Sequence, residues 1–523
     1  MYIWKKGMIL LCGLVICAGC RRREVQPKDQ KNLRPNIIFI LADDLGYGDL
    51  GSFGQELIET PNLDALARDG MRFTQHYSGA PVCAPSRYMI LTGKHAGHAF
   101  IRGNDEWNQR GPVWDYRAVA HDSTLEGQRP MPGNEVLLSD LMQKAGYRTG
   151  LFGKWGLGAP HTESIPTESG FDTFFGYNCQ RQAHTYYPLH LYRDRNRVPL
   201  ENDTIPPHST FEVDKGNWGE ELFEQGDYAP FRIYSALEDF IGESPDRPFF
   251  AYWATPIPHV PLQAPGKWVS YYRRKFGEEP RYVAGKRNGY FPHRYPRAAY
   301  AAMISYLDAQ IGRLIDTLKK RGLYENTLIV FTSDNGPSYA GGAQPEWFNS
   351  GGLFPAGYGR AKGFLYEGGI RVPLIASWPG HIRPGTVSDL PTAQYDLLAT
   401  FGAVAGFEPP DPADGISFLP TLLGSGMQQR HDFLLWAYPE YGGQLALRAG
   451  DWKLIWRGLN DTDLNPEPEL YHLGEDPQER NNLAESYPER VDSLLRLFHK
   501  EYEVPEIPLF RLKKYESRFR AGH

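Results

Sequence analysis

Oxygen-bearing side chains occur in two pairs far apart in the sequence, and each pair follows a short apolar run. Asp43 and Asp44 come after residues 36–42, and Asp334 and Asn335 come after residues 327–332. These four side chains offer only oxygen ligands, which suit a hard cation such as calcium or magnesium rather than zinc. The alternative for either pair is an ordinary turn after a strand. The cysteine motif described below favours the metal site.

Two further polar side chains also stand where predicted strands end. Lys154 closely follows the run 147–152, and His259 lies just beyond the run 249–254. Open α/β sheets bind ligands outside the carboxyl ends of their strands. We therefore expect these side chains and the two oxygen-bearing pairs to meet at one edge of a sheet, around an anionic ligand.

A cysteine stands at the start of a predicted helix. The run Cys83-Ala84-Pro85-Ser86-Arg87 opens a helix over residues 84–92, with Pro85 in the first turn, where its missing N–H costs nothing. The amides of a helix N-terminus favour a bound anion. The alternative is a buried structural cysteine before a helix.

This five-residue run resembles the Cys-x-Pro-Ser-Arg signature of the type I sulfatases, and the resemblance extends from about Pro35 to about Pro488. It implies an alkaline-phosphatase-like fold and a sulfatase activity. It further implies that a maturation enzyme oxidises Cys83 to formylglycine, whose hydrate is the nucleophile. The metal implied is one calcium ion, with the modified Cys83 oxygen as a further ligand.

The same resemblance assigns the other catalytic roles. Arg87 orients the nucleophile and offsets charge near the metal, and Lys154 and Lys362 neutralise the sulfate oxygens. His259 is the predicted general acid at the leaving alcohol, since imidazole can donate a proton near neutral pH. One position departs from the pattern. Many relatives have a histidine that touches the nucleophile where this chain has Gly156. Either His95 or His184 replaces it as the base, or water and the metal suffice.

Substrate-binding residues are predicted from three segments. His95, Arg102 and Asn104 follow the nucleophile helix, and His184 lies in a loop that resembles one of carbohydrate-directed relatives. Glu440 would come from the C-terminal domain. The expected substrate is a sulfated saccharide of galactose or N-acetylgalactosamine type.

Two other functions stay open at this point. One is a formylglycine-dependent phosphodiesterase or phosphonate monoester hydrolase, although Asn335, where two-zinc relatives have histidine, argues for one metal. The other is a catalytically idle glycan-binding lipoprotein, which Gly156 alone suggests.

Alternating strands and helices predict an α/β fold, namely a large α/β/α domain with a mostly parallel central sheet over residues 35–425. Short strands and turns predict a smaller C-terminal α+β domain with an antiparallel sheet over residues 426–523. The individual elements are predicted over 36–42, 134–145, 147–152, 249–254, 297–320, 327–332, 445–448, 452–456, 470–471 and 489–502.

The N-terminus predicts export. Residues 1–20 form a lipoprotein-type signal ending in Ala18-Gly19-Cys20, and residues 21–34 form a polar tether. We expect a bacterial periplasmic or outer-membrane-anchored lipoprotein with a lipid anchor at Cys20; a plain cleaved signal or a retained anchor is the alternative. A net charge of −6 argues against a nucleic-acid partner. With Cys20 lipidated and Cys83 converted, no intramolecular disulfide is expected.

Overall fold

The computed structural model describes residues 34–203, 226–243, 247–283, 289–461 and 466–520, together with Met1, Glu224 and Asp463. The predicted signal and tether lie outside the described residues, apart from Met1 and Arg34. Among the helices that the structure describes, none combines the length and the apolar character needed to cross a bilayer.

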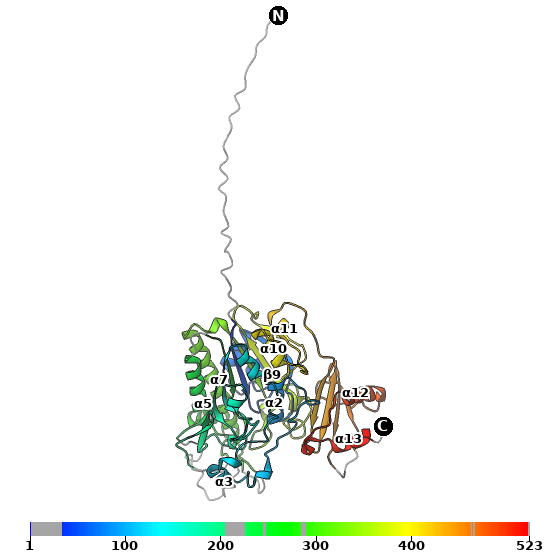
Figure 1. The fold of residues 1–523 in the computed structure, drawn as a ribbon, viewed down its shortest axis with the longest axis horizontal. Coiled ribbons are helices and arrows are strands. Elements are labelled where there is room, and N and C mark those ends of the chain that lie inside the picture. Colours follow the sequence, from blue (N-terminus) through cyan, green and yellow to red (C-terminus); the bar gives the residue numbers. More distant parts are fainter. Residues whose placement is uncertain are drawn as a thin grey trace. The chain divides into compact units, whose positions relative to one another are not determined.

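A mixed sheet of 11 strands forms the centre of the molecule (Figure 1). Its strand order is β10-β2-β9-β8-β1-β7-β3-β4-β5-β6, with β11 beside β2. The strands β8, β1, β7, β3 and β4 are mutually parallel, which confirms the predicted mostly parallel sheet. The bounds are β1 (Asn36–Ala42), β2 (Met71–Tyr77), β3 (Arg148–Lys154), β4 (Thr173–Tyr177), β5 (His190–Arg193), β6 (Asn196–Pro199), β7 (Phe249–Ala254), β8 (Thr327–Ser333), β9 (Arg371–Ser377), β10 (Thr386–Ser388) and β11 (Thr392–Ala393).

The central strand β1 is buried on both faces, as its continuous apolar sequence predicts. Successive side chains of a strand point to opposite faces of the sheet. Accordingly Ile37, Phe39 and Leu41 join one hydrophobic core, and Ile38, Ile40 and Ala42 join the other.

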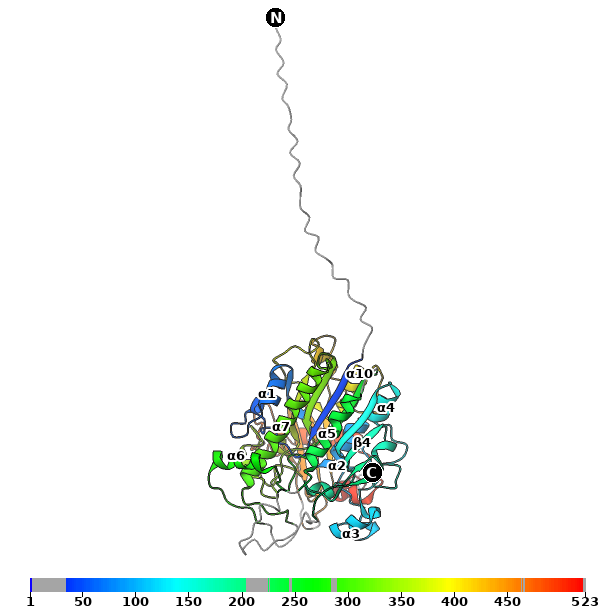
Figure 2. The same ribbon diagram turned by 90° about the vertical axis from the view of Figure 1, so that its left-hand side faces the viewer.

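Helices cover both faces of this sheet. One core includes α1 (Pro61–Arg68), α5 (Ala229–Gly242), α6 (Gly266–Phe276) and α7 (Pro296–Lys320), and Figure 2 shows α1, α5 and α7 together on this side. The other core includes α2 (Cys83–Thr92), α4 (Leu138–Lys144) and α10 (Asp396–Ala405). The predicted α/β/α layering is therefore confirmed.

Predicted element bounds agree with the structure to within two residues, except at one helix start. The strand over residues 249–254 has the predicted bounds, and that over 147–152 begins one residue later and extends to Lys154. The helix predicted from residue 134 begins only at Leu138. There the Asp140 carboxylate accepts a hydrogen bond from the Leu137 amide at 3.1 Å and closes the first turn.

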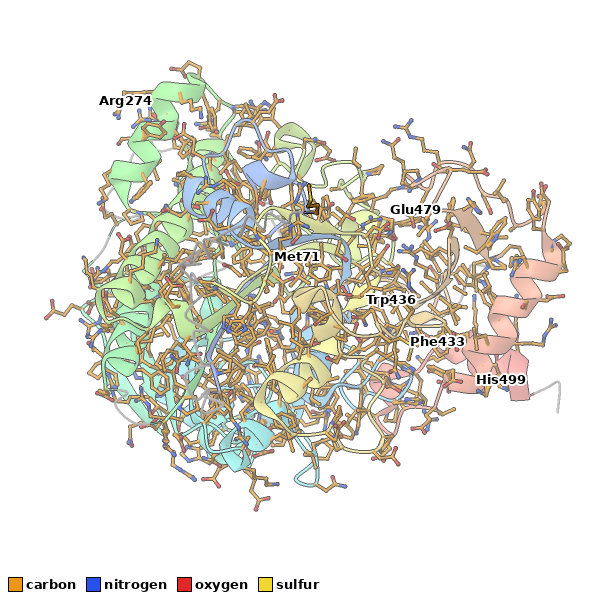
Figure 3. The ribbon with its side chains drawn as sticks, turned by 90° about the horizontal axis from the view of Figure 1, so that it is seen from above. Met71, Arg274, Phe433, Trp436, Glu479 and His499 are labelled. Atoms are coloured by element: carbon orange, nitrogen blue, oxygen red, sulfur yellow. The ribbon has the colours of Figure 1, made fainter. Side chains whose placement is uncertain are left out.

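A separate antiparallel sheet follows in the chain, in the order β12 (Leu434–Tyr438), β13 (Gln444–Ala449), β14 (Trp452–Arg457) and β15 (Glu469–His472). The helices α12 (Pro488–Glu501) and α13 (Lys513–Arg520) come after it. Trp436, labelled in Figure 3, ties this sheet to the large domain, because its indole N–H donates to the carbonyl of Ser78 at 2.8 Å. The antiparallel C-terminal sheet is confirmed, and the domain boundary at residue 425 stays a prediction.

Candidate active site

Four segments that are distant in sequence bring polar side chains to the carboxyl edge of the parallel strands. Asp43 and Asp44 directly follow β1, and Asp334 and Asn335 directly follow β8, the neighbour of β1. Lys154 is the last residue of β3, and His259 lies shortly after β7. These strands are adjacent in the order β8-β1-β7-β3, so their ends deliver the predicted residues to one place.

Each carboxylate at this edge contacts a buried or half-buried cation. Lys154 Nζ lies 2.6 Å from Asp43 Oδ2, and Lys362 Nζ lies 2.6 Å from Asp44 Oδ1. The guanidinium of Arg87 donates twice to Asp334 Oδ2, at 3.0 and 2.9 Å, and once to the Lys154 carbonyl at 2.9 Å. Although burial disfavours ionisation, the nearby charge of Lys154 and the other cations hold the pKa of Asp43 well below its usual range.

Cys83 is the first residue of α2 and lies in the middle of these charges. Its thiol donates to Asp43 Oδ1 at 3.3 Å, and Lys362 Nζ lies 3.5 Å from the sulfur. Burial, together with the negative charge of Asp43, raises the pKa of the Cys83 thiol far above its usual value. An unmodified thiol here is harder to ionise than an ordinary cysteine, and the thiolate rather than the thiol is the nucleophilic form.

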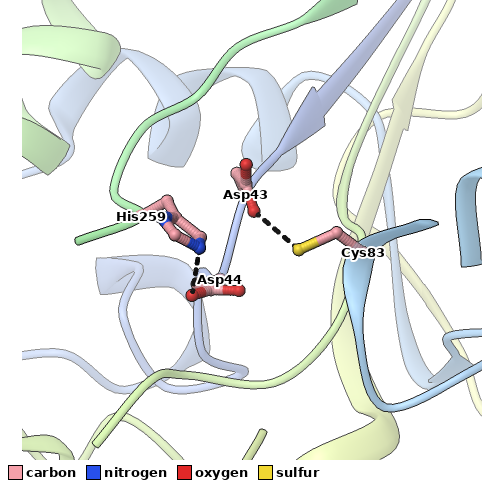
Figure 4. A group of neighbouring side chains, drawn as sticks. All are labelled: Asp43, Asp44, Cys83 and His259. Carbon is pink, nitrogen blue, oxygen red and sulfur yellow. Dashed lines mark hydrogen bonds and ion pairs between the residues drawn. The ribbon is translucent and has the colours of Figure 1, made fainter. Parts of the chain in front are cut away.

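His259 faces the same cluster, as Figure 4 shows. Its Nδ1 lies 2.5 Å from the Val260 carbonyl, which places a proton on Nδ1 and leaves Nε2 directed at Asp44 Oδ2, 3.7 Å away. Burial, followed by the charge of Lys362, lowers the pKa of His259 to about 4. The His184 ring stacks on it, with centroids 5.0 Å apart and an interplanar angle of 10°.

The oxygen-bearing set fits a divalent cation. Asn335 Nδ2 donates to Asp44 Oδ1 at 2.8 Å, but its Oδ1 is buried and has no hydrogen-bond partner among the described residues. Burial and the neighbouring Asp43 charge raise the pKa of Asp334 to about 6. A cation would satisfy the orphaned oxygen and favour the ionised carboxylate. Asp43, Asp44, Cys83 and His259 also place ligand atoms within 4.8 Å of one another, so His259 borders this site.

Hydrogen bonds from neighbouring residues hold this cluster in place. Ser86 Oγ donates to the Asp334 carbonyl at 2.6 Å and also contacts Gln394, whose Nε2 donates to the Ser333 carbonyl at 2.5 Å. Ser86 belongs to the cysteine motif. Nothing in the sequence signals Gln394, which lies 308 residues from Ser86 along the chain.

Three of the predicted substrate-binding residues lie beside the cluster. Asn104 Oδ1 accepts a hydrogen bond at 3.3 Å from the backbone N–H of Ala84, the residue after the nucleophile position. The backbone N–H of Asn104 donates to Glu440 Oε1. Burial raises the pKa of Glu440 to about 7. His184 stacks on His259, as described above. These three residues therefore lie next to the cluster, and their contact with a substrate stays a prediction.

The other two predicted substrate-binding residues have structural contacts instead. The Arg102 guanidinium donates to the backbone carbonyls of Ala99, Gly97 and Glu503. The His95 amide donates to Asp414 at 2.8 Å. Both side chains are buried, and neither makes a hydrogen bond to Cys83 or to the carboxylates of the cluster among the described residues. A role for His95 and Arg102 in substrate binding stays a prediction.

Comparisons with known proteins agree with this geometry. Residues 35–407 match the family model described as Sulfatase, and residues 358–503 match that described as N-sulphoglucosamine sulphohydrolase, C-terminal. The chain belongs to the sulfatase family. It is thus a sulfuric ester hydrolase of the alkaline-phosphatase-like superfamily, which confirms the family and the activity that the cysteine motif implied.

Similar sulfatases cover nearly the whole chain. It is 33% identical to arylsulfatase A of Bos taurus over 498 residues, which cover 88% of this chain and 86% of the relative. It is 30% identical to N-acetylgalactosamine-6-sulfatase of Homo sapiens over 517 residues, which cover 91% of this chain and 87% of the relative. A solved sulfatase structure, from work on glycosaminoglycan metabolism by Bacteroides thetaiotaomicron, has a TM-score of 0.67 at 25% identity and covers 89% of this chain and 99% of that chain.

The position where this sulfatase departs from the pattern is occupied by another side chain. Gly156 has a φ of +77°, and a Cβ atom built on it would lie 3.0 Å from Gln180 Oε1. Gln180 Nε2 donates to Asn104 Oδ1 at 3.1 Å, while its Oε1 is buried and has no hydrogen-bond partner in the described part of the chain. Gln180 therefore fills the space of a side chain at residue 156. The spacing of the motifs gave no signal for it.

Proposed function

We propose that this sulfatase removes sulfate from a carbohydrate, specifically a sulfated galactose or N-acetylgalactosamine unit. The observation that carries the proposal is the polar group formed by Asn104, Gln180 and Glu440 beside residue 84. Its amide and carboxyl groups suit sugar hydroxyls, and they adjoin a cationic site that suits the sulfate. The N-acetylgalactosamine-6-sulfatase relatives support the same class of substrate.

The proposed nucleophile is formylglycine, made from Cys83 by a formylglycine-generating maturation enzyme. Its hydrate would supply the attacking hydroxyl, which the thiol of Cys83 lacks. The contact of Lys362 Nζ with the Cys83 side chain, at 3.5 Å, supports this assignment, because a cation beside the nucleophile would stabilise the negative charge of a sulfate under attack.

We assign one calcium ion to Asp43, Asp44, Asp334 and Asn335, with the modified residue 83 as a further ligand. The orphaned Asn335 oxygen and the all-oxygen donor set support it. When bound, such an ion neutralises negative charge on the sulfate ester. Lys154 and Lys362 add positive charge around the same sulfate, and Arg87 holds Asp334 in position.

His259 is the proposed general acid. Its Nδ1 contact with the Val260 carbonyl fixes the ring so that Nε2 faces the cluster. A histidine at this position can hold a proton on Nε2, and negative charge on a bound sulfate ester favours the protonated ring. The stacked ring of His184 limits how far His259 can move.

We also propose that the protein is exported and anchored by a lipid at Cys20, as a periplasmic or outer-membrane lipoprotein. The support is the sequence of residues 1–20 alone, with its charged start, short apolar core and terminal Ala-Gly-Cys. Radioactive palmitate incorporation that disappears in Cys20→Ser would test the anchor.

A panel of sulfated mono- and oligosaccharides, with an aryl sulfate and an aryl phosphate beside them, tests the substrate. We expect turnover to be highest on a galactose-type or N-acetylgalactosamine-type sulfate, because sugar contacts supply binding energy used at the transition state. Faster turnover of the aryl phosphate would favour a phosphodiesterase or phosphonate monoester hydrolase. Saccharide binding without any turnover would favour an idle glycan-binding protein.

A further inference from the structure

Two exposed tyrosines flank the active-site lysine. Tyr358 lies four residues before Lys362 and is 77% exposed, the largest exposure of any aromatic side chain in the described residues. Tyr441 comes from the turn between β12 and β13 and is 49% exposed. Lys362 itself contacts Asp44 and the Cys83 sulfur, so both rings lie on elements that adjoin the reacting centre.

Both exposed rings pack against other aromatic rings. Tyr358 makes edge-type contacts with Tyr339, at 5.1 Å and 89°, and with Phe364, at 5.6 Å and 77°. Tyr441 makes an edge-type contact with Phe364 at 5.4 Å and 75°. We call these four rings, Tyr339, Tyr358, Phe364 and Tyr441, the aromatic rim. A ring that is already held in place loses little conformational entropy when a ligand covers it.

Unusual backbone conformations bring Tyr441 against Gly363, the residue after Lys362. Tyr441 has a φ of +50°, which a bulky residue rarely adopts. Gly363 has a φ of +85°, and a Cβ atom there would lie 2.9 Å from Tyr441 Cε1. Only a residue without a side chain lets this ring approach so closely. Unusual backbone geometry of this kind concentrates at functional sites.

We propose that the aromatic rim binds the sugar next to the sulfated unit, so that the substrate is an oligosaccharide rather than a free monosaccharide. The inference rests on the proposed carbohydrate function and names the substrate class more narrowly. The C–H face of a pyranose is apolar and buries area against an aromatic ring, whereas its hydroxyls remain free for water. The sulfated unit beside Lys362 would place its neighbour over Tyr358 and Tyr441.

The test compares two substrates on the matured enzyme. They are N-acetylgalactosamine 6-sulfate and a tetrasaccharide that carries this unit at its non-reducing end. For Tyr358→Ala we expect a rise of roughly three- to tenfold in KM for the tetrasaccharide, with kcat unchanged and the monosaccharide unaffected. Tyr358→Phe keeps the ring and should restore the wild-type KM. The control is Tyr487→Ala. Tyr487 directly precedes α12 and is about as exposed as Tyr441, and its replacement should leave the KM for both substrates unchanged.

Three outcomes would overturn the inference. An unchanged tetrasaccharide KM in Tyr358→Ala, with wild-type enzyme active on both saccharides, removes the rim from substrate binding and leaves the proposed function intact. A wild-type enzyme inactive on both saccharides but active on an aryl sulfate refutes the proposed function and the rim together. A dimer in sedimentation that Tyr358→Ala converts to monomer assigns the rim to contact between two copies of this chain.

Discussion

Lys453 should be among the most costly side chains to replace outside the Cys83 cluster. Its Nζ lies 2.8 Å from a carboxylate oxygen of Glu367 and 2.8 Å from one of Glu479, and all three side chains are at most 1% exposed. Glu367 keeps a second cation, Arg371, at 2.9 Å. The next cation to Glu479, Arg360, is 3.9 Å away, so Lys453→Met leaves Glu479 as a poorly compensated buried charge. Breaking a buried pair in this way costs about 3–5 kcal/mol in the free energy of unfolding.

The loss should depend on pH in a defined direction. Burial raises the pKa of Glu479 to about 7, with Lys453 opposing the rise and Glu367 adding to it. When the pKa of a carboxyl group is higher in the folded than in the unfolded protein, the free energy of unfolding falls as the pH rises from the unfolded-state pKa to the folded-state pKa. Without Lys453 the folded-state pKa rises further, so Glu479 is protonated and neutral at pH 5.5. The loss should therefore be smaller at pH 5.5 than at pH 8.

Urea unfolding followed by tryptophan fluorescence at both pH values measures this difference. Lys500→Met, at a lysine 78% exposed and 2.9 Å from Glu501, is the matched control and should change stability by no more than about 0.5 kcal/mol. Adding Glu479→Gln to Lys453→Met should recover part of the loss. A loss under about 1 kcal/mol at pH 8, or equal losses at the two pH values, would refute the reasoning.

Four further predictions concern the site itself. The peptide spanning Cys83 in active protein should be lighter by the thiol-to-aldehyde conversion, and Cys83→Ala should abolish turnover without lowering the Tm; full activity with an unmodified thiol contradicts this. Exhaustive chelation should suppress activity and lower the Tm, because an ion at 100 times its Kd stabilises the folded protein by about 2.7 kcal/mol. Calcium should restore both better than zinc, since the site offers oxygen ligands. Activity that survives chelation argues against the metal. His259→Ala should slow saccharide desulfation roughly 10²–10⁴-fold and affect an aryl sulfate less, since its leaving group needs less protonation; equal losses on both substrates would exclude His259 as the acid. Gly156→His should lower activity and Tm, because of the positive φ and the clash with Gln180, and adding Gln180→Gly should recover part of the loss; a gain in activity from the single change would show that Gln180 does not fill this space.

Several features of this protein were determined by local sequence. Continuous apolar runs set the strands, and the polar residues directly after them had to meet at the sheet edge, because parallel strands share one carboxyl end. This is why Asp43, Lys154, His259 and Asp334 could be predicted as neighbours although 291 residues separate the first from the last. The cysteine motif fixed the family in the same way, from residues adjacent in the chain.

Tertiary structure alone decided which loop residues contact the nucleophile helix. Asn104 and Arg102 are two residues apart, yet only Asn104 contacts the nucleophile helix at Ala84, whereas Arg102 binds backbone carbonyls elsewhere. Gln180 reaches the space beside Gly156, and Tyr441 reaches Gly363, through loops whose paths follow no periodic pattern. Strand and helix positions follow from short-range periodicity, but the path of a loop depends on the distant residues that it packs against. For that reason the sequence determined the chemistry of the strand edge, and only the fold determined its surroundings.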